Sequence, residues 1–302
     1  MNIRMIALVK TKINIRTIND DPTDFCKLFQ IYQLATKDDD IVIDFTGCGF
    51  LRQNAVSFLG GLCRLKELNG SDVSFDWSTL SEKIYMNLAQ NGFVDAMDGS
   101  ASSWDGNSIP YREDLLLDSN EIVDYLKTKW LGKGWINVSR KLSNAISGNL
   151  YEIYANAFEH GDSKVGVFTC GQYYKSLHEL ALTVIDFGVG IPYNVREYQK
   201  KFRLGHTIRS DKALEWAFQR GTTTKADGTS RGMGLDLLKQ FIKVNNGRLH
   251  LFSHDAYVFI DANDERYMNH PCHFKGTALN ITLSCDERYY ILDDEKGKTN
   301  LF

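Results

Sequence analysis

The segment Glu152-Ile-Tyr-Ala-Asn156-Ala-Phe-Glu159-His160-Gly161 lies in a stretch whose apolar residues recur at helical spacing over residues 138–160. Residues four apart share one face of a helix, so Glu152 and Asn156 project together and His160 follows one turn later. This pair suits a hydrated magnesium ion, which takes few protein ligands. We therefore expect Asn156 to bind the metal and Glu152 to act as a general base. The alternatives are a solvated helix face and a histidine that packs or caps.

A second motif, Asp186-Phe-Gly188-Val-Gly190, directly follows the apolar run 180–185, which predicts a strand. Two glycines after a strand-end acid allow the backbone to approach a planar ligand closely. The carboxylate of Asp186 is an acceptor suited to an exocyclic amine such as that of adenine. The alternative is an Asx-type turn that closes the strand.

A third motif is a polar, glycine-rich stretch over residues 220–234 that leads into a predicted helix at 235–244. Free amides at a helix N-terminus attract phosphate, and hydroxyls and cations can complete its coordination. A stretch of this length can also act as a lid or be a structural loop. The candidate phosphate contacts are Thr224, Lys225, Arg231, Gly232 and Gly234.

Together these motifs resemble the GHKL superfamily of ATP-binding proteins, which share the Bergerat fold. The superfamily pattern is Glu-x-x-x-Asn, Asp-x-Gly-x-Gly, Gly-x-Gly entering a helix and a late Gly-Thr, here Gly276-Thr277. Within it, Asn156-Ala-x-x-His160-Gly161 and Thr223-Thr-Lys225 resemble bacterial anti-sigma-factor serine kinases. The similarity covers roughly residues 141–284.

The resemblance implies ATP and magnesium as cofactors, with Asn156 as the metal ligand, Glu152 as the general base and Asp186 reading the adenine amine. The same resemblance places Gly188, Gly190 and Thr277 near the base, and Lys225, Arg231, Gly232 and Gly234 at the phosphates.

The first hundred residues alternate between strand and helix patterns, which predicts a parallel or mixed sheet covered by helices. Strands are expected at 12–18, 41–45 and 72–77, and helices at 23–35, 54–68 and 80–91. A Gly-, Ser- and Asp-rich stretch at 101–118 predicts a linker, and residues 119–302 the ATP-binding domain. The predicted fold class is therefore two-domain α/β, with a Bergerat-type α/β sandwich in the second domain.

The N-terminal half resembles the STAS domain of anti-sigma-factor antagonists through residues 39–45 and Thr46-Gly-Cys-Gly-Phe50-Leu51. STAS domains carry a phosphorylatable serine at the start of the next helix. The matching positions here read Arg52-Gln53-Asn54-Ala55 and contain no hydroxyl. A docking or regulatory role is therefore expected for this half, rather than phosphate acceptance.

The composition argues against several classes of protein. A net charge of −3 does not indicate a nucleic-acid partner, and no apolar run reaches the roughly 20 residues of a membrane span. Six scattered cysteines predict reduced thiols and a cytoplasmic protein. The group around His270, Cys272, His273 and Cys285 could suggest zinc, but no CxxC pair supports a four-ligand site.

Three functions remain open: a serine/threonine kinase acting on a protein partner, a slow ATPase switch, and a nucleotide-gated binding module without turnover. Glu152 favours the first two, because a pure binder needs no base. A histidine kinase is disfavoured, since no histidine lies between residues 119 and 158. The expected partner is a STAS-type antagonist or another regulator, and a homodimer is possible.

Overall fold

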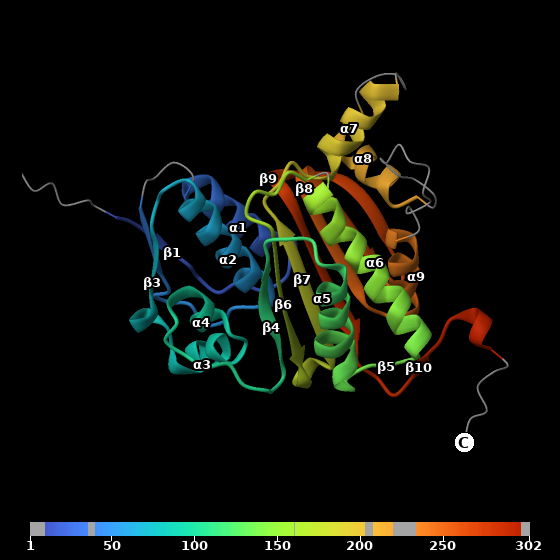
Figure 1. Ribbon diagram of the computed structural model, residues 1–302, viewed down its shortest axis with the longest axis horizontal. Helices are drawn as coiled ribbons and strands as arrows, with labels where there is room; N and C mark the ends of the chain where they lie inside the picture. Colours follow the sequence, from blue (N-terminus) through green and yellow to red (C-terminus); the bar gives the residue numbers. More distant parts are fainter. Residues whose placement is uncertain (1–9, 36–39, 160, 203–207, 220–233, 297–302) are drawn as a thin grey trace, which may run out of the picture.

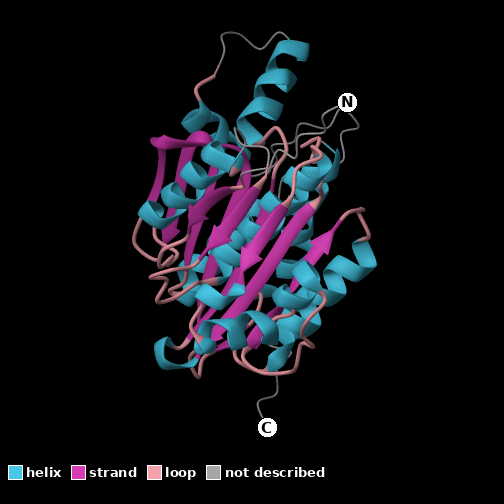
Figure 2. Cartoon of the chain, turned by 90° about the vertical axis from the view of Figure 1, so that its left-hand side faces the viewer, coloured by secondary structure: helices cyan, strands magenta, loops and turns pink. Residues whose placement is uncertain are grey.

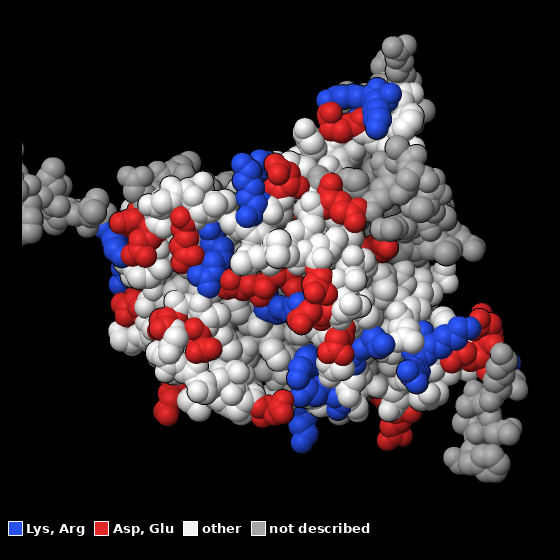
Figure 3. Space-filling model, in the orientation of Figure 1, with Lys and Arg blue, Asp and Glu red and all other residues white. Residues whose placement is uncertain are grey.

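The computed structural model describes residues 10–35, 40–159, 161–202, 208–219 and 234–296. It is a mixed α/β structure, as predicted, with a small sheet near the N-terminus and a larger one in the second half of the chain (Figure 1). On the face shown in Figure 3, acidic and basic side chains are interspersed.

The N-terminal region is a parallel three-stranded sheet in the order β1-β2-β3, which agrees with the strand–helix alternation of its sequence. Its strands are β1 (Thr11–Asn14), β2 (Ile41–Asp44) and β3 (Val73–Asp76), and a 3₁₀ turn follows at Trp77–Thr79. Its helices are α1 (Pro22–Ala35), α2 (Gln53–Leu68), α3 (Glu82–Gln90) and α4 (Phe93–Asp98).

The larger sheet is antiparallel throughout, with the order β4-β6-β7-β9-β8. Its strands are β4 (Ser108–Asp114), β6 (Val167–Tyr174), β7 (Glu179–Asp186), β8 (Arg248–Asp261) and β9 (Glu265–Ser284). Short strands β5 (Asn137–Val138) and β10 (Tyr289–Tyr290) pair separately, and 3₁₀ turns lie at Lys175–Leu177 and Asp293–Glu295.

Helices α5 (Ser119–Tyr125), α6 (Arg140–Glu159) and α9 (Gly234–Asn245) lie along one side of this sheet, with a π turn at Leu126–Trp130 and a 3₁₀ turn at Leu131–Lys133 after α5 (Figure 1). Helices α7 (Ile191–Phe202) and α8 (Ser210–Ala217) lie beyond one end of the strands (Figure 1). A loop-rich stretch is expected from the sequence between residue 186 and the helix at 235–244, so α7, of which only Pro192 and Val195 are buried, departs from that expectation.

The expected linker at residues 101–118 contains strand β4, so this prediction needs correction. β4 is hydrogen-bonded to β6, with Asp114 opposite Val167, and buries Ile109 and Tyr111. Pro110 cannot donate to a ladder and is tolerated because β4 is the edge strand of the sheet. The glycines and serines before β4 concealed its short alternating pattern.

The last strands are also longer than predicted. The apolar runs 248–253 and 256–260 predict two separate strands, but they form one irregular strand, β8, whose register with β9 shifts around His254. The sequence predicts a last strand at 277–283, whereas β9 already begins at Glu265, because its first half pairs with β8 as an extended hairpin. The hairpin turn is held by Asp261, whose Oδ1 accepts from the N–H groups of Asn263 and Asp264 at 2.8 Å.

Helices cover both faces of the large sheet (Figures 1 and 2). Side chains of successive strand residues point to opposite faces, so each face has its own set of core residues. Toward α6 and α9 it presents an aliphatic set that includes Leu182, Val184, Leu251, Leu279 and Ile281. Toward α1 and α2 it presents an aromatic set, Phe168, Phe252 and Phe274, which packs with Phe25, Phe29 and Phe58. The N-terminal region therefore shares a core with the sheet.

Helix α2 approaches the sheet closely at a pair of glycines. A Cβ on Gly60 would lie 1.8 Å from the Tyr111 hydroxyl, and one on Gly61 would lie 2.1 Å from the Phe187 ring. Larger residues at these two positions would push the helix off the sheet.

Cys26 of α1 and Cys272 of β9 form a disulfide, so the expectation of reduced thiols is wrong for this pair. The other four cysteines, Cys48, Cys63, Cys170 and Cys285, are free and buried. The pairing could not be read from spacing, because the two residues are 246 positions apart.

Candidate functional site

A pocket opens at the end of strand β7, beside Thr277 of β9, where these strands meet α6 and the start of α7. Its walls combine three aliphatic residues with a few polar groups, a composition typical of small-molecule sites. The lining residues are Ile153, Asn156, Ala157, Gly161, Asp186, Gly190, Ile191, Asn194 and Thr277.

Asp186 and Thr277 face the pocket together because they are opposite residues of the antiparallel strands β7 and β9. Both are only 5% exposed. Burial raises the pKa of Asp186 to about 6, although hydrogen bonds from the Gly188 amide and from Thr277 oppose the shift. The Gly188 N–H donates to Asp186 Oδ1 at 2.8 Å. The site thus holds a buried carboxylate at the end of a strand.

Helix α6 brings Asn156 to the same pocket. The helix buries Leu142, Ile146 and Leu150, and Ser139 Oγ caps its start by accepting from the Leu142 N–H at 3.0 Å. At its other end, the Gly161 N–H donates to the Asn156 carbonyl at 2.7 Å. The Asn156 side chain is half-buried and lines the pocket.

Glu152 lies one helical turn before Asn156 and is also half-buried. Glu152 is not part of the pocket wall. The structure therefore brings Asn156 and Asp186 to one pocket, whereas Glu152, the predicted base, lies one helical turn before Asn156 and outside the pocket wall.

Two glycines of the Asp186 motif are required by backbone contacts. Gly190 has φ +75°, and a Cβ there would lie 2.6 Å from the Lys275 carbonyl oxygen. A Cβ on Gly188 would lie 2.1 Å from the carbonyl oxygen of Gly161, which accepts from the Val189 N–H at 2.5 Å. Gly190 lines the pocket and Gly188 does not. The turn after β7 is thereby packed against the end of α6.

Residues of β8 hold this turn from the other side. Ser253 Oγ accepts from the Ile191 N–H at 3.0 Å and donates to the Gly276 carbonyl at 2.9 Å. His254 Nε2 lies 2.6 Å from the Val189 carbonyl oxygen, and burial lowers the pKa of this histidine. A neutral ring then donates from Nε2. Neither Ser253 nor His254 belongs to one of the sequence motifs.

Ile191 and Asn194 were also missed, because they belong to α7. A signal for this helix was present in Pro192, since proline is favoured in the first turn of a helix. Of the lid motif, Gly234 is described and begins α9, close to the predicted start of the helix. Four other predicted phosphate contacts, together with His160, lie outside the described residues: Thr224, Lys225, Arg231 and Gly232.

Comparison with known families identifies the domain. Residues 143–286 match the family described as histidine kinase-, DNA gyrase B-, and HSP90-like ATPase. No curated protein matches the chain. None of the described helices combines the length and hydrophobicity that a membrane crossing requires. Residues 143–286 are therefore a GHKL-type ATPase domain, and the pocket lies within it.

Proposed function

We propose that the chain is a magnesium- and ATP-dependent regulatory protein whose nucleotide occupies the pocket between α6, β7 and β9. The observation that carries this proposal is the convergence of Asn156, Asp186 and Thr277 on one cavity, inside a domain of an ATPase family. The three residues come from three elements, and all three were selected from sequence motifs.

The adenine end of the site is the part next to Asp186. Its carboxylate accepts hydrogen bonds only, so it selects a ring with an exocyclic amine over one with a carbonyl at that position. The aliphatic side chains of Ile153 and Ile191 offer contacts to the faces of a base. Buried hydrogen-bonding groups of this kind discriminate strongly, because a wrong ligand leaves the carboxylate unpaired.

The residues present also fit a magnesium ion. The amide oxygen of Asn156 is a hard ligand, and a magnesium site needs only one or two protein ligands beside water and phosphate. Bound magnesium would neutralise charge on the phosphates. Asn156 would hold the ion at the α6 wall, and Glu152 would accept a proton one turn away.

The reaction we propose is transfer of the γ-phosphoryl group to a serine or threonine of a protein partner, as in anti-sigma-type kinases. The bond between the γ-phosphorus and its bridging oxygen breaks, a bond to the hydroxyl oxygen forms, and Glu152 takes the hydroxyl proton. Arg52, Gln53 and Asn54, at the STAS-like phosphoacceptor position, are buried. This supports an acceptor on another protein, such as a STAS-type antagonist.

The test is to incubate the full chain with ATP and magnesium, alone and with the products of neighbouring genes, and to measure intact masses. A gain of one phosphate on a partner is expected. Glu152→Ala should retain ATP binding and lose transfer, while the matched variant Glu159→Ala, on the exposed last turn of α6, should retain both. Unimpaired transfer by Glu152→Ala would contradict the assignment of the base.

A second candidate is a slow ATPase switch, and one feature of β9 favours it. Thr277 of this strand faces the pocket, whereas Asn280, three residues on, accepts a hydrogen bond from Gln53 Nε2 of α2 at 2.9 Å. One strand therefore contacts both the nucleotide site and the N-terminal region. ADP release without a phosphorylated protein would support this candidate; binding without turnover would support a nucleotide-gated module.

We also propose that the N-terminal region is a STAS-like domain with a docking role and that the protein is cytoplasmic. The parallel order β1-β2-β3 supports the STAS-like fold, and the buried start of α2, which carries no hydroxyl at residues 52–55, supports a role other than phosphate acceptance. The mixed charges in Figure 3 support a protein partner, which can be a second copy of the chain, over a nucleic acid.

A further inference from the structure

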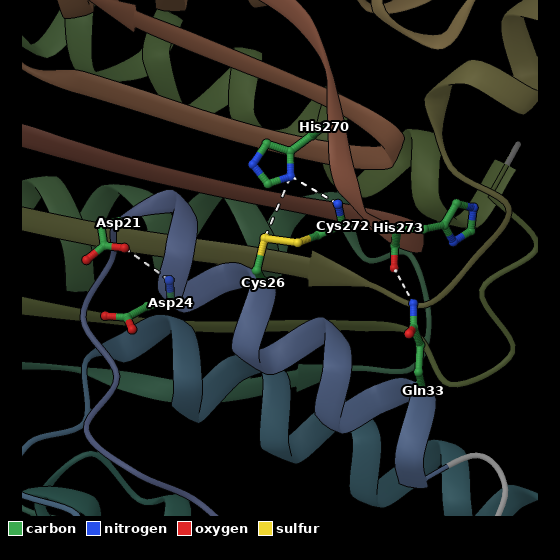
Figure 4. The surroundings of a disulfide bond; sticks show 7 residues. All are labelled: Asp21, Asp24, Cys26, Gln33, His270, Cys272 and His273. Atoms are coloured by element: carbon green, nitrogen blue, oxygen red, sulfur yellow. Dashed lines mark hydrogen bonds between the residues drawn. A yellow bond between two sulfur atoms is a disulfide. The ribbon is translucent and has the colours of Figure 1, made fainter.

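Cys26, Cys272 and His270 meet where α1 of the N-terminal region lies against β9 (Figure 4). One ligand atom from each, the two sulfurs and a ring nitrogen, lie within 4.8 Å of one another. All three residues are half-buried. The proposed nucleotide site does not include this cluster, although Thr277, which lines that site, lies five residues after Cys272 on β9.

The imidazole of His270 is oriented toward the sulfurs. Its Nδ1 lies 3.7 Å from Cys26 Sγ and accepts a hydrogen bond from the Cys272 backbone N–H at 3.3 Å. An accepting Nδ1 carries a lone pair, so the proton of the neutral ring is on Nε2. His273 behaves differently, because its ring is directed away from the disulfide and packs on His254 (Figure 4).

The separation of Cys26 Sγ from His270 Nδ1 matches that of two ligands in a tetrahedral zinc site. With Zn–S bonds of about 2.3 Å and Zn–N bonds of about 2.0 Å, a sulfur and a nitrogen ligand lie roughly 3.6 Å apart. The observed 3.7 Å between Cys26 Sγ and His270 Nδ1 agrees. The two Cα atoms, 5.5 Å apart, also leave room for separated thiolates.

We propose that the reduced chain binds one Zn²⁺ ion through Cys26, Cys272 and His270, and that the disulfide is the metal-free form of the same site. A dithiol reductant opens the bridge, becoming a disulfide itself and leaving two cysteine thiols. Zinc binding then releases both thiol protons, and the Nδ1 lone pair of His270 exchanges the hydrogen bond from the Cys272 N–H for the metal. Two thiolates balance the charge of the ion, which suits a half-buried position, and the fourth ligand is water.

The bridge and the metal would join the same two segments, so α1 stays attached to β9 in both forms. The sequence pattern groups His270 and Cys272 with His273 and Cys285, and Cys26 is too distant in the chain to be included. Cys285 is buried in the aliphatic core of the other face.

The experiment uses the full chain, reduced anaerobically with a phosphine and freed of it, and titrated with Co²⁺ as the probe. We expect one equivalent to bind with thiolate-to-cobalt charge-transfer bands, Zn²⁺ to displace it, and the oxidised chain to show neither. Zn²⁺ should also raise the melting temperature of the reduced chain, because it binds the folded form.

Variants separate the proposed ligands from their neighbours. Cys26→Ser and Cys272→Ser should each lose the stoichiometric charge-transfer bands, and His270→Ala should weaken binding at least about tenfold. His273→Ala is the matched control and should bind like the original chain. Circular dichroism verifies that each variant is folded. Failure of the reduced chain to bind Co²⁺, or equal binding by His270→Ala and His273→Ala, would overturn the proposal, whatever the outcome for ATP.

Discussion

The two faces of the large sheet are built from alternate residues of the same strands, yet they differ in whether the polar groups beside them border a cavity. On the α6 face, the polar residues Asn156, Asp186 and Thr277 border a cavity. On the α2 face, Arg52 forms ion pairs with both Asp20 and Glu179. A polar group that borders a cavity is available to a ligand, whereas one that is already paired holds the protein together.

The α2 face, called the paired face below, has many ionic contacts. Arg52 donates to Asp20 at 2.6 Å, and its guanidinium lies 4.2 Å from the centre of the Tyr174 ring. Arg248 donates to Glu179 at 2.7 and 3.0 Å. Burial alone would raise the pKa of Asp20, but the two arginines outweigh it and the pKa is lowered. Substitutions on the two faces should therefore affect different properties.

The largest effect is expected from Arg52→Ala. It leaves Asp20, only 8% exposed, without its closest cation, and such a loss costs about 3 kcal/mol of unfolding free energy. Urea denaturation measures this, and Arg140→Ala, exposed at the start of α6, is a control expected within about 0.5 kcal/mol of the original. A folded Arg52→Ala chain with lower ATP affinity would show that the faces are not independent.

The next largest effect is expected on the α6 face, which borders the cavity. Asn156→Ala should lower the affinity for ATP in the presence of magnesium about 100-fold, since a charge-assisted contact contributes about 1.5–3 kcal/mol. Isothermal titration calorimetry measures it. Asn149→Ala removes the same amide two turns earlier on α6, where it bonds the Ala145 carbonyl, and should bind ATP normally. Equal affinities of the two variants would remove the case for a metal ligand at Asn156.

A smaller effect is expected from pH. The pKa of Asp186 is about 6, so lowering the pH from 7.5 to 5 leaves only about one tenth of the carboxylate and should weaken ATP binding about tenfold. Asp186→Asn, which cannot titrate, should lack this pH dependence. A change of the same size in both proteins would assign the dependence to another group.

The raised pKa of Asp186 also affects the stability of the fold: low pH weakens ATP binding but increases stability. The folded pKa lies above the ordinary value of 3.8, so the protonated acid stabilises the fold at low pH. This contribution is complete below about pH 4 and is lost as the pH rises through 6. Asp186→Asn should therefore be more stable than the original chain at pH 7.5, and the difference should shrink toward pH 4 in thermal unfolding.

The smallest effect is expected from Gln53→Ala on the paired face. It removes a hydrogen bond to Asn280 and one from the Tyr174 hydroxyl at 2.7 Å. Because Asn280 keeps a bond from Thr183 at 2.6 Å, the cost should be about 1 kcal/mol in urea denaturation. A loss as large as that of Arg52→Ala would mean that Gln53, rather than the ion pairs, holds α2 in place.

Short-range patterns were read correctly from the sequence. The β-branched run at 41–45 and the apolar periodicity of 138–160 predicted β2 and α6, because burial on one face leaves a period. The Asp186 and Asn156 motifs identified residues of one pocket for a related reason, since each motif depends on local geometry at the end of a strand or on one helix face.

Features that depend on distant partners could not be predicted. Strand β4 looked like a linker because its stability comes from β6, more than fifty residues later. Ser253 and His254 belong to no motif, and only the register of β8 with β9 brings them to the turn after Asp186. The pairing of Cys26 with Cys272 likewise depends on the contact between α1 and β9, which no local sequence pattern indicates.

The aromatic core between α2 and the sheet has a practical consequence for anyone who wishes to isolate the nucleotide-binding half. Removing the residues before β4 would expose Phe168, Phe252 and Phe274 to water as one continuous hydrophobic patch. Such a fragment should aggregate on expression, while the intact chain should melt in a single cooperative transition. Although it looks like two modules in sequence, the molecule should behave as one folding unit.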